Sequence, residues 1–229
     1  MKFYCLICTR SYEASPVLND LISYLSRGEV ETKLLVNQES IFGAYNKGIK
    51  AIEPDDEDII IMCHDDIEIL TEIEDFKEIL DNSLDEEAGF VGVAGTEDFG
   101  FPCVWWDHTK WKQGKHSGWI EHEESGKGRY STDYGPHRQV VVLDGVFLAA
   151  RGKVLKELEL EKPAIFEGNW DFYDIYYTTE AHLLKYKNKT VEIKMCHKSI
   201  GDTDGRESWH ANRLAYYMKY KKQLPLLLP

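Results

Sequence analysis

The side chains best suited to chemistry in this chain are His64, Asp65 and Asp66, which directly follow the apolar run DIIIM at 58–62. That run has the length and composition of a buried strand. In open α/β sheets ligands bind at the carboxyl ends of strands, so acidic side chains there suggest a metal. The two carboxylates repel each other unless a cation or proton intervenes, and a divalent ion with bound phosphates would supply positive charge. The sequence predicts a metal-bridged phosphate ligand here; a solvated turn is the alternative, because Asp is common where a strand ends.

Composition limits the classes of protein and partner. The 229 residues, 43% of them hydrophobic, suffice for one large α/β domain or two small ones. The net charge of -13 is spread along the chain, which argues against nucleic acid or anionic lipid as a partner. The five cysteines are odd in number and lie mostly in apolar runs, as expected for reduced thiols in a cytoplasmic protein.

Targeting and membrane segments are not expected from the hydropathy pattern. The apolar run at 3–8 is too short for the core of a signal peptide, and no stretch approaches the roughly 20 apolar residues of a membrane span. We therefore predict a cytoplasmic protein. The apolar end LPLLLP, at 224–229, suggests a homo-oligomer contact, a membrane-surface contact or an artificial chain boundary, and the sequence leaves these three open.

Hydrophobic spacing predicts alternating strands and helices in the first part of the chain. Strands are expected at 3–8, 32–36, 58–62 and 90–94, and helices at 16–25, 41–52 and 73–80, the first two capped by Ser15 and Ser40. This alternation predicts an α/β fold with a mostly parallel central sheet and helices on both faces. No repeat or flexible linker interrupts the pattern, so we expect one domain.

The second part of the chain is less regular. Residues 95–138 show no clear period, which favours a functional loop or mobile lid. Trp105, Trp106, Trp111 and Trp119 fall there; they could pin the loop to the body or stack on sugars or bases. We then expect strands at 139–143 and 146–149, a helix in the second part of 166–186, a half-exposed strand at 190–196 that ends beside His197, and a helix at 207–222.

Five segments together resemble the nucleotide-sugar glycosyltransferases of the GT-A fold, in the prokaryotic glycosyltransferase-like branch of family two. They are ESIFGAYNKGI (39–49), IIIMCHDDIEI (59–69), VVLDGVFLAARGKVL (141–155), FYDIYYTTEAHLLKYK (172–187) and HKSIG (197–201). The resemblance lies in their order and spacing and spans nearly the whole chain. It implies a single GT-A-like domain over 1–229, with a Rossmann-like nucleotide-sugar-binding half (1–94), a Trp-rich loop or lid (95–138) and an acceptor half (139–229).

The resemblance also implies roles for individual residues. The metal, Mn²⁺ or Mg²⁺, would be bound by Asp66, with His64 and His197 completing its shell. Asp174 falls where the family has its acceptor-activating carboxylate. The donor would contact Thr9, Arg10, Asn46, Lys47, Asp65, Asp144 and Gly145, and the acceptor would contact Trp105, Trp106, Trp170 and Asp171. One position departs from the family: many relatives have a second Asp two places after the Asp174 equivalent, where this chain has Tyr176.

These residue types fit transfer of a sugar from a nucleoside diphosphate, with a UDP-sugar favoured as donor. A divalent ion stabilises the negative charge that builds on the leaving diphosphate, while a carboxylate such as Asp174 takes the proton of the acceptor hydroxyl, which predicts inversion. The acceptor is a glycan or another hydroxyl compound. Two alternatives stay open: a non-catalytic nucleotide- or glycan-binding relative, and a metal-dependent phosphohydrolase. Asp174 could also simply cap its helix, and His197 and Asn46 could be ordinary surface-loop and backbone-bonding residues.

Overall fold

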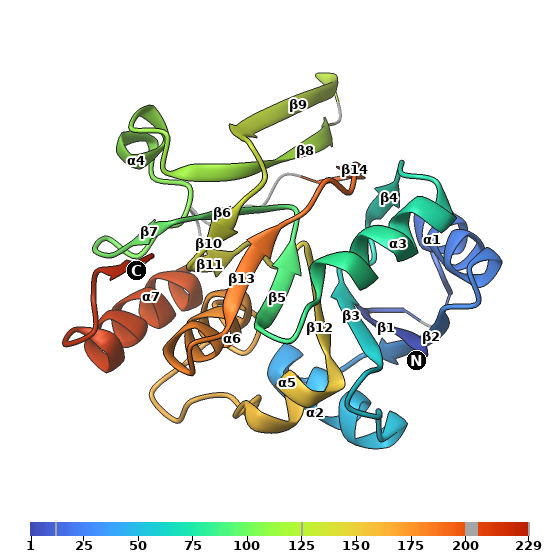
Figure 1. Ribbon diagram of the computed structural model, residues 1–229, viewed down its shortest axis with the longest axis horizontal. Coiled ribbons are helices and arrows are strands. Elements are labelled where there is room, and N and C mark those ends of the chain that lie inside the picture. The colour runs from blue at the N-terminus through green and yellow to red at the C-terminus, as the bar shows by residue number, and fades with distance from the viewer. Residues whose placement is uncertain (12, 125, 200–205, 229) are drawn as a thin grey trace.

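The computed structural model describes residues 1–11, 13–124, 126–199 and 206–228, so Ile200 and Gly201 of the HKSIG segment lie outside the described residues. Its first part alternates strands and helices, as the spacing predicts (Figure 1). These elements are β1 (Phe3–Thr9), α1 (Pro16–Arg27), β2 (Glu31–Val36), α2 (Ile41–Ile52), β3 (Ile59–Cys63), α3 (Ile73–Ser83) and β5 (Ala88–Gly92). Both caps are confirmed, because the hydroxyls of Ser15 and Ser40 accept hydrogen bonds from the first turns of α1 and α2.

The central sheet is mixed rather than mostly parallel, which corrects the expectation from the sequence. Its strand order is β10-β13-β5-β12-β3-β1-β2. β1 is parallel to β2 and β3, and β13 (Lys187–Thr190) is parallel to β5. In contrast, β12 (Phe147–Arg151) is antiparallel to both β3 and β5, and β10 (Gln139–Val140) is antiparallel to β13. The chain enters β12 at the edge where β3 ends, so β12 has to run back in the opposite direction.

Helices cover both faces of this sheet, as predicted. Side chains alternate along β3: Ile60 and Met62 join the core under α2, α5 (Gly152–Glu157), α6 (Tyr173–Leu183) and α7 (Glu207–Tyr220). Ile59, Ile61 and Cys63 join a second core under α1 and α3. Among the described residues, no helix combines the length and apolar character needed to cross a membrane.

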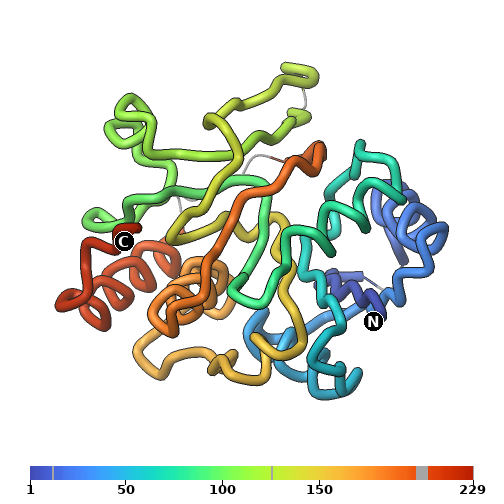
Figure 2. The backbone as a smooth tube through the Cα atoms, in the orientation of Figure 1, coloured from blue at the N-terminus to red at the C-terminus, as the bar shows by residue number. Residues whose placement is uncertain are grey.

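Residues 95–138 contain regular structure, contrary to the expectation of an irregular loop. The segment holds β7 (Asp98–Phe99), α4 (His108–Lys112) and a hairpin of β8 (His116–Glu124) and β9 (Gly128–Gly135), which extends away from the body in Figures 1 and 2. β8 also belongs to a second sheet, of order β11-β6-β8-β14-β4. Its other strands are β11 (Val142–Leu143), β6 (Ala94–Thr96), β14 (Met195–His197) and β4 (Ile67–Ile69).

Two strands predicted as continuous are divided between the sheets. The segment 139–143 contributes β10 to the central sheet and β11 to the second. The expected strand at 190–196 is likewise broken: β13 ends at Thr190 in the central sheet, and β14 begins at Met195 in the second. These changes of sheet bring the end of β14 beside the end of β3.

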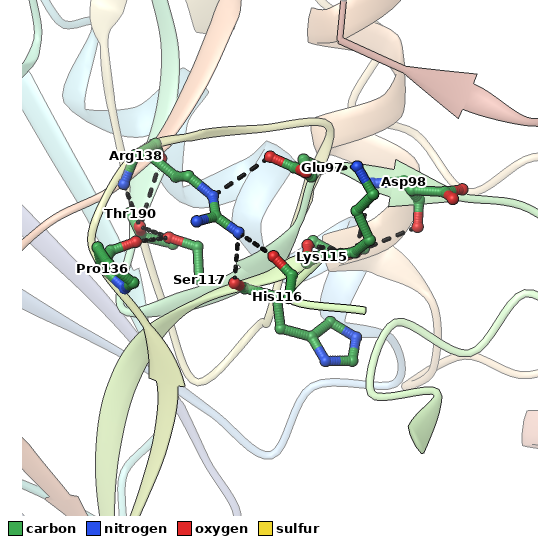
Figure 3. A network of polar contacts seen from close by, with 10 residues as sticks. Glu97, Asp98, Lys115, His116, Ser117, Pro136, Arg138 and Thr190 are labelled. Atoms are coloured by element: carbon green, nitrogen blue, oxygen red, sulfur yellow. Dashed lines mark hydrogen bonds and ion pairs between the residues drawn. The ribbon is translucent and has the colours of Figure 1, made fainter. Parts of the chain in front are cut away.

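A polar network fixes the base of the β8–β9 hairpin to the central sheet (Figure 3). The Ser117 hydroxyl of β8 lies 2.5 Å from the Thr190 hydroxyl of β13. Arg138, which follows the hairpin, donates to the carbonyl of His116 at 2.8 Å and lies 3.3 Å from the Glu97 carboxylate. Because these groups join both sheets, the hairpin is held in a defined position over the carboxyl ends of the central strands.

Part of the apolar C-terminal segment is docked on the chain itself. β15 (Leu226–Leu227) pairs antiparallel with β7, and the side chain of Leu226 is buried. Pro229 lies outside the described residues. The homo-oligomer suggested by this segment stays a prediction.

Candidate metal centre and its two cavities

His64, Asp66 and His197 converge at the end of β3, as the sequence suggested. His197 Nε2 lies 3.2 Å from Asp66 Oδ1 and 3.3 Å from His64 Nδ1, and His64 Nδ1 lies 3.9 Å from Asp66 Oδ1. The fold explains the convergence: β3 ends just before His64, and the antiparallel pairing of β14 with β4 places His197 opposite Ile67. Within the described residues these three side chains form a group that could hold a metal ion.

The pKa values of His64 and Asp66 favour the protonation states that bind a metal ion. Burial raises the pKa of Asp66, but hydrogen bonding and charge from His197, with a hydrogen bond from Ser199, outweigh it and bring the pKa to about 2. Burial, reinforced by the neighbouring His197, lowers the pKa of His64. Near neutral pH the group therefore offers an ionised carboxylate and a neutral imidazole, the forms that bind metal ions.

Tyr173 and Gly145 form the wall behind His64. The Tyr173 hydroxyl donates to the carbonyl oxygen of Gly145 at 2.6 Å and lies 3.3 Å from His64 Nε2. Position 145 has to be glycine: a Cβ there would lie 2.5 Å from the Tyr173 hydroxyl and 2.9 Å from the Cβ of Asp174. The predicted donor residue Gly145 is thus required for the close approach of α6 to the loop before β12.

A cavity of about 540 Å³, which we term the strand-end cavity, opens beside the triad at the carboxyl ends of β1 and β3. Thr9, Arg10 and Asp65, three predicted donor-binding residues, line it together with His64 and Asp66. Its remaining lining residues are Cys8, Ser11, Glu13, Ser15, Ile41, Tyr45, Cys63, Trp170, Tyr173 and Arg206. Most of these lining residues carry a polar or charged group.

A second cavity of 460 Å³, which we term the aromatic cavity, lies on the other side of the triad. Aromatic and imidazole side chains form most of its lining, and Asp144, Asp171 and Asp174 contribute carboxylates. The rings come from Trp105, Trp106, His108, Trp111, His122, Tyr134, Trp170, Phe172, Tyr173 and Trp209. The two cavities share His64, Trp170, Tyr173 and Arg206, so they meet at the triad. Together they offer a polar compartment and an aromatic compartment on either side of one candidate metal centre.

Asp174 has the protonation behaviour expected of a base that works near neutral pH. It lies in the first turn of α6, half-buried against Gly145. Burial raises its pKa to about 7, with a further contribution from the negative charge of Asp144. A group with such a pKa can accept a proton and release it at the same pH.

Asn46 and Lys47 lie away from the triad, and the carboxylate of Asp171, which lines the aromatic cavity, already has partners on this chain. Asn46 donates to Glu161 Oε1 at 3.1 Å and lines a separate cavity on the outer side of α2, and Lys47 is exposed, so the structure does not bring either to the triad. Asp171 is buried, with its carboxylate oxygens engaged by Arg206 at 3.1 Å and by Ser208 at 2.9 Å.

Asp144 and the three tryptophans predicted to contact the acceptor line the aromatic cavity. Trp105 is buried and donates to Asp144 Oδ2 at 3.0 Å, which makes it a support for that carboxylate. Trp106 is half-buried beside Trp209, and Trp170 is exposed where the two cavities meet. Trp106 and Trp170 therefore have accessible ring surface for a ligand.

Tyr173 and Arg206 were missed by the sequence reasoning. Tyr173 stands one residue before the candidate base, among several tyrosines of the same helix, and no sequence signal distinguishes it from them. Arg206 belongs to a segment without periodicity, and only its ion pair with Asp171 and its place in both cavities mark it.

Comparison with solved structures finds proteins with which this chain shares structural similarity. GalNAc-T7, solved with UDP, GalNAc and Mn²⁺, shares the fold at a TM-score of 0.52 and 10% identity, over 91% of this chain and 45% of that one, so this chain spans less than half of that protein. A197 from STIV has a TM-score of 0.47 and 11% identity, covering 90% of this chain and 99% of the other. HddC from Yersinia pseudotuberculosis has a TM-score of 0.41 and 11% identity, covering 96% and 99%. No curated protein sequence matches the chain.

The mixed α/β fold, with its candidate metal centre at the strand ends, is of the GT-A glycosyltransferase class. The model of the glycosyltransferase-like family matches residues 6–219. The chain therefore belongs to the glycosyltransferase-like family.

Proposed function

We propose that this protein is a metal-dependent glycosyltransferase that moves a sugar from a nucleoside-diphosphate sugar to an acceptor hydroxyl, with inversion. The observation that carries the proposal is the meeting of a polar and an aromatic cavity at His64, Asp66 and His197. Such a layout lets a donor and an acceptor approach one point from opposite sides. The glycosyltransferase-like family match and the UDP- and Mn²⁺-bound fold neighbour support the same reading.

The three side chains fit a divalent ion. Two ligands at right angles on an ion with bonds of about 2.1 Å are separated by about 3.0 Å, so the distances of 3.2, 3.3 and 3.9 Å need only small adjustments. Of the two ions that the family resemblance implies, Mn²⁺ accepts imidazole ligands more readily than Mg²⁺, which prefers oxygen, so Mn²⁺ is the better candidate of the two. When bound, the ion would act as a Lewis acid for the leaving diphosphate.

The strand-end cavity is the proposed place of the nucleotide. Thr9 ends β1 and Arg10 follows it, next to the candidate metal centre, and Asp65 offers a carboxylate that could accept a hydrogen bond from a ribose hydroxyl. Arg206 lines both cavities and carries positive charge where the diphosphate would lie. Its ion pair with the buried Asp171 would hold the guanidinium in place.

The aromatic cavity is the proposed place of the acceptor. Ring faces such as those of Trp106 and Trp170 can pack on the C–H surface of a sugar, and the carboxylates can accept its hydroxyl hydrogens. Asp174 would take the proton of the attacking hydroxyl, which is a poor nucleophile while protonated. Attack from the acceptor side, opposite the diphosphate, would invert the anomeric carbon.

Calorimetry and product analysis test this function together. We expect UDP to bind in the presence of Mn²⁺ and to bind weakly without it, and we expect UDP-sugars to yield intact UDP and a product of inverted configuration by NMR. Release of inorganic phosphate instead would indicate a phosphohydrolase. Binding with no turnover of any UDP-sugar, with or without acceptor, would indicate a non-catalytic relative, and no binding of UDP, GDP or dTDP with Mn²⁺ would refute the donor site.

A further inference from the structure

We propose that Tyr173 is a positioning residue that fixes the tautomer of His64, so that Nδ1, the ring nitrogen facing Asp66 and His197, keeps its lone pair free for the metal ion. The inference rests on the proposed metal-dependent function. The Tyr173 hydroxyl contacts Nε2 of the His64 ring, whereas Nδ1 of the same ring faces the other two candidate ligands.

The hydrogen-bond inventory of the tyrosine leads to this tautomer. A phenol has one hydrogen to donate, and a backbone carbonyl can only accept. Tyr173 donates this hydrogen to the carbonyl oxygen of Gly145, at 2.6 Å. The Tyr173 oxygen can then only accept from His64 Nε2, 3.3 Å away, so the hydrogen of the neutral ring sits on Nε2 and Nδ1 carries none. Ligand histidines are commonly held in this way, through the nitrogen that does not bind the metal.

The Tyr173 ring is itself held firmly. It is almost fully buried, with ring centroids 5.7 Å from Tyr45, 6.1 Å from Tyr177 and 6.5 Å from Phe42. Gly145 brings its carbonyl to the hydroxyl because it lacks a Cβ that would collide with it. A hydroxyl fixed by its ring and by its acceptor defines both the orientation of the His64 ring and the place of its hydrogen.

The geometry around Nδ1 agrees with a free lone pair. His197 Nε2 lies 3.3 Å from His64 Nδ1 and 3.2 Å from Asp66 Oδ1. Because His64 Nδ1 and the Asp66 carboxylate both present lone pairs, the hydrogen in the metal-free protein has to come from His197. A divalent ion held by these three side chains would take the place of that hydrogen, which would leave to solvent or be carried on His197 Nδ1 instead, and His64 Nδ1, Asp66 and His197 Nε2 would then all offer lone pairs to the ion.

The experiment compares Tyr173→Phe with Tyr177→Phe. Tyr177 is a matched control, because its hydroxyl is also buried on α6 and donates to a backbone carbonyl, that of Leu160 at 2.8 Å. Each variant loses one buried hydrogen bond, so both should lose about 1 kcal/mol of folding free energy. Only Tyr173→Phe should also weaken Mn²⁺ binding, by roughly tenfold, as loss of such a supporting partner does.

The second readout is the His64 tautomer itself, observed by nitrogen NMR of the metal-free, histidine-labelled protein at mildly alkaline pH. We expect the Nε2–H form in the wild type and in Tyr177→Phe, and a mixture of both tautomers in Tyr173→Phe. An Nδ1–H form in the wild type, or equal Mn²⁺ affinity and unchanged tautomer in Tyr173→Phe, would overturn the proposal. If the wild type binds no Mn²⁺, the proposed function fails, and the tautomer in the metal-free protein still decides this inference.

Discussion

The two cavities that meet at His64 are built in different ways. The strand-end cavity is made where β1 and β3 end, so its polar groups are a consequence of sheet topology. The aromatic cavity is assembled from rings of α4 and the loop before it, of the β8–β9 hairpin, of the start of α6 and the loop before it, and of α7. The first arrangement suits a charged ligand bound through a metal, and the second suits a ligand bound through its surface. Substitutions in the strand-end cavity should therefore change metal and nucleotide binding, and substitutions in the aromatic cavity should change acceptor binding and turnover.

The largest effect is expected from removing a metal ligand. Asp66→Ala takes away the carboxylate that the two histidines face. Loss of a supporting partner alone costs 10- to 100-fold in metal affinity, so loss of this ligand should cost more than about 100-fold and abolish turnover. Calorimetry with Mn²⁺ and then with UDP measures both losses. Acceptor binding to the aromatic cavity should persist.

Asp20→Ala provides the control, because Asp20 is an exposed aspartate of α1, away from both cavities. It should bind Mn²⁺ as the wild type does. Equal Mn²⁺ affinity in Asp66→Ala would contradict a metal centre at the end of β3, and simultaneous loss of both ligands without unfolding would contradict the independence of the two cavities.

The next largest effect concerns the acceptor side. Asp174→Asn keeps the shape of the side chain but cannot accept a proton, so kcat should fall by about 10² to 10⁴, while UDP affinity stays the same. Because the pKa of Asp174 is about 7, kcat/KM of the wild type should rise as the pH increases through about 7, where the carboxyl ionises. The residual activity of Asp174→Asn should lack this rise. An unchanged pH profile in the variant would assign the base to another group.

The sequence predicts the fold where strands and helices bury a regular apolar face, and it fails where strands are held together by polar groups. Regular hydrophobic spacing marked β1, α1, α2 and β3, because each buries one apolar face or two against its neighbours. The β8–β9 hairpin carries the opposite signal. Its outer part is polar and is tied together by Arg129, which pairs with Glu68, Glu121 and Glu123, so hydropathy gave no indication of strands there.

The site divides in a similar way. His64 and Asp66 could be found because an apolar strand leads directly to them, and the resemblance to a family pointed to His197 and Asp174. Tyr173 and Arg206 depend on contacts between segments far apart in the chain, such as the 2.6 Å bond from Tyr173 to Gly145. Local sequence patterns carry no information on such contacts.

A smaller effect is expected from the aromatic wall. Trp106 lines only the aromatic cavity and packs at 5.7 Å from Trp209. Trp106→Ala should raise the KM for the acceptor by about tenfold, since an aromatic contact contributes about 1 kcal/mol beyond its buried area. The Kd for UDP with Mn²⁺ should stay constant. Trp119→Ala is the matched control, because Trp119 does not line this cavity, although its neighbour Ile120 does; an equal change in both variants would point to general destabilisation of the second sheet.

Stability should change in the opposite direction from activity at Asp174. In the folded protein this carboxyl holds its proton up to about pH 7, whereas in the unfolded chain it loses the proton near its ordinary pKa of about 3.9. Between about pH 4 and pH 7 the chain therefore has to take up a proton at Asp174 in order to fold, so the cost in folding free energy grows over this range and is constant above about pH 7. Asp174→Asn should be more stable than the wild type at alkaline pH, by at most about 4 kcal/mol, and the difference should vanish as the pH falls to about 4. Thermal unfolding over this pH range measures it; a constant difference would contradict the raised pKa.

The smallest effect, on UDP affinity, is expected at Asn46, where the family resemblance and the geometry disagree. The resemblance assigns Asn46 to the donor, yet its amide donates to Glu161 on the outer side of α2. Tyr45, one residue earlier and about 100° around the helix, lines the strand-end cavity instead. Asn46→Ala should therefore leave the Kd for UDP with Mn²⁺ within about twofold, because an exposed hydrogen bond contributes little.

Arg10→Ala is the informative partner of that variant. Arg10 is exposed and lines the strand-end cavity, so loss of its charge should weaken UDP binding by about five- to tenfold, corresponding to roughly 1 kcal/mol. Both substitutions remove an exposed polar side chain, and they differ in which side of α2 they concern. If Asn46→Ala weakened UDP binding and Arg10→Ala did not, the nucleotide would lie on the outer side of α2, and the strand-end cavity would lose its assigned ligand.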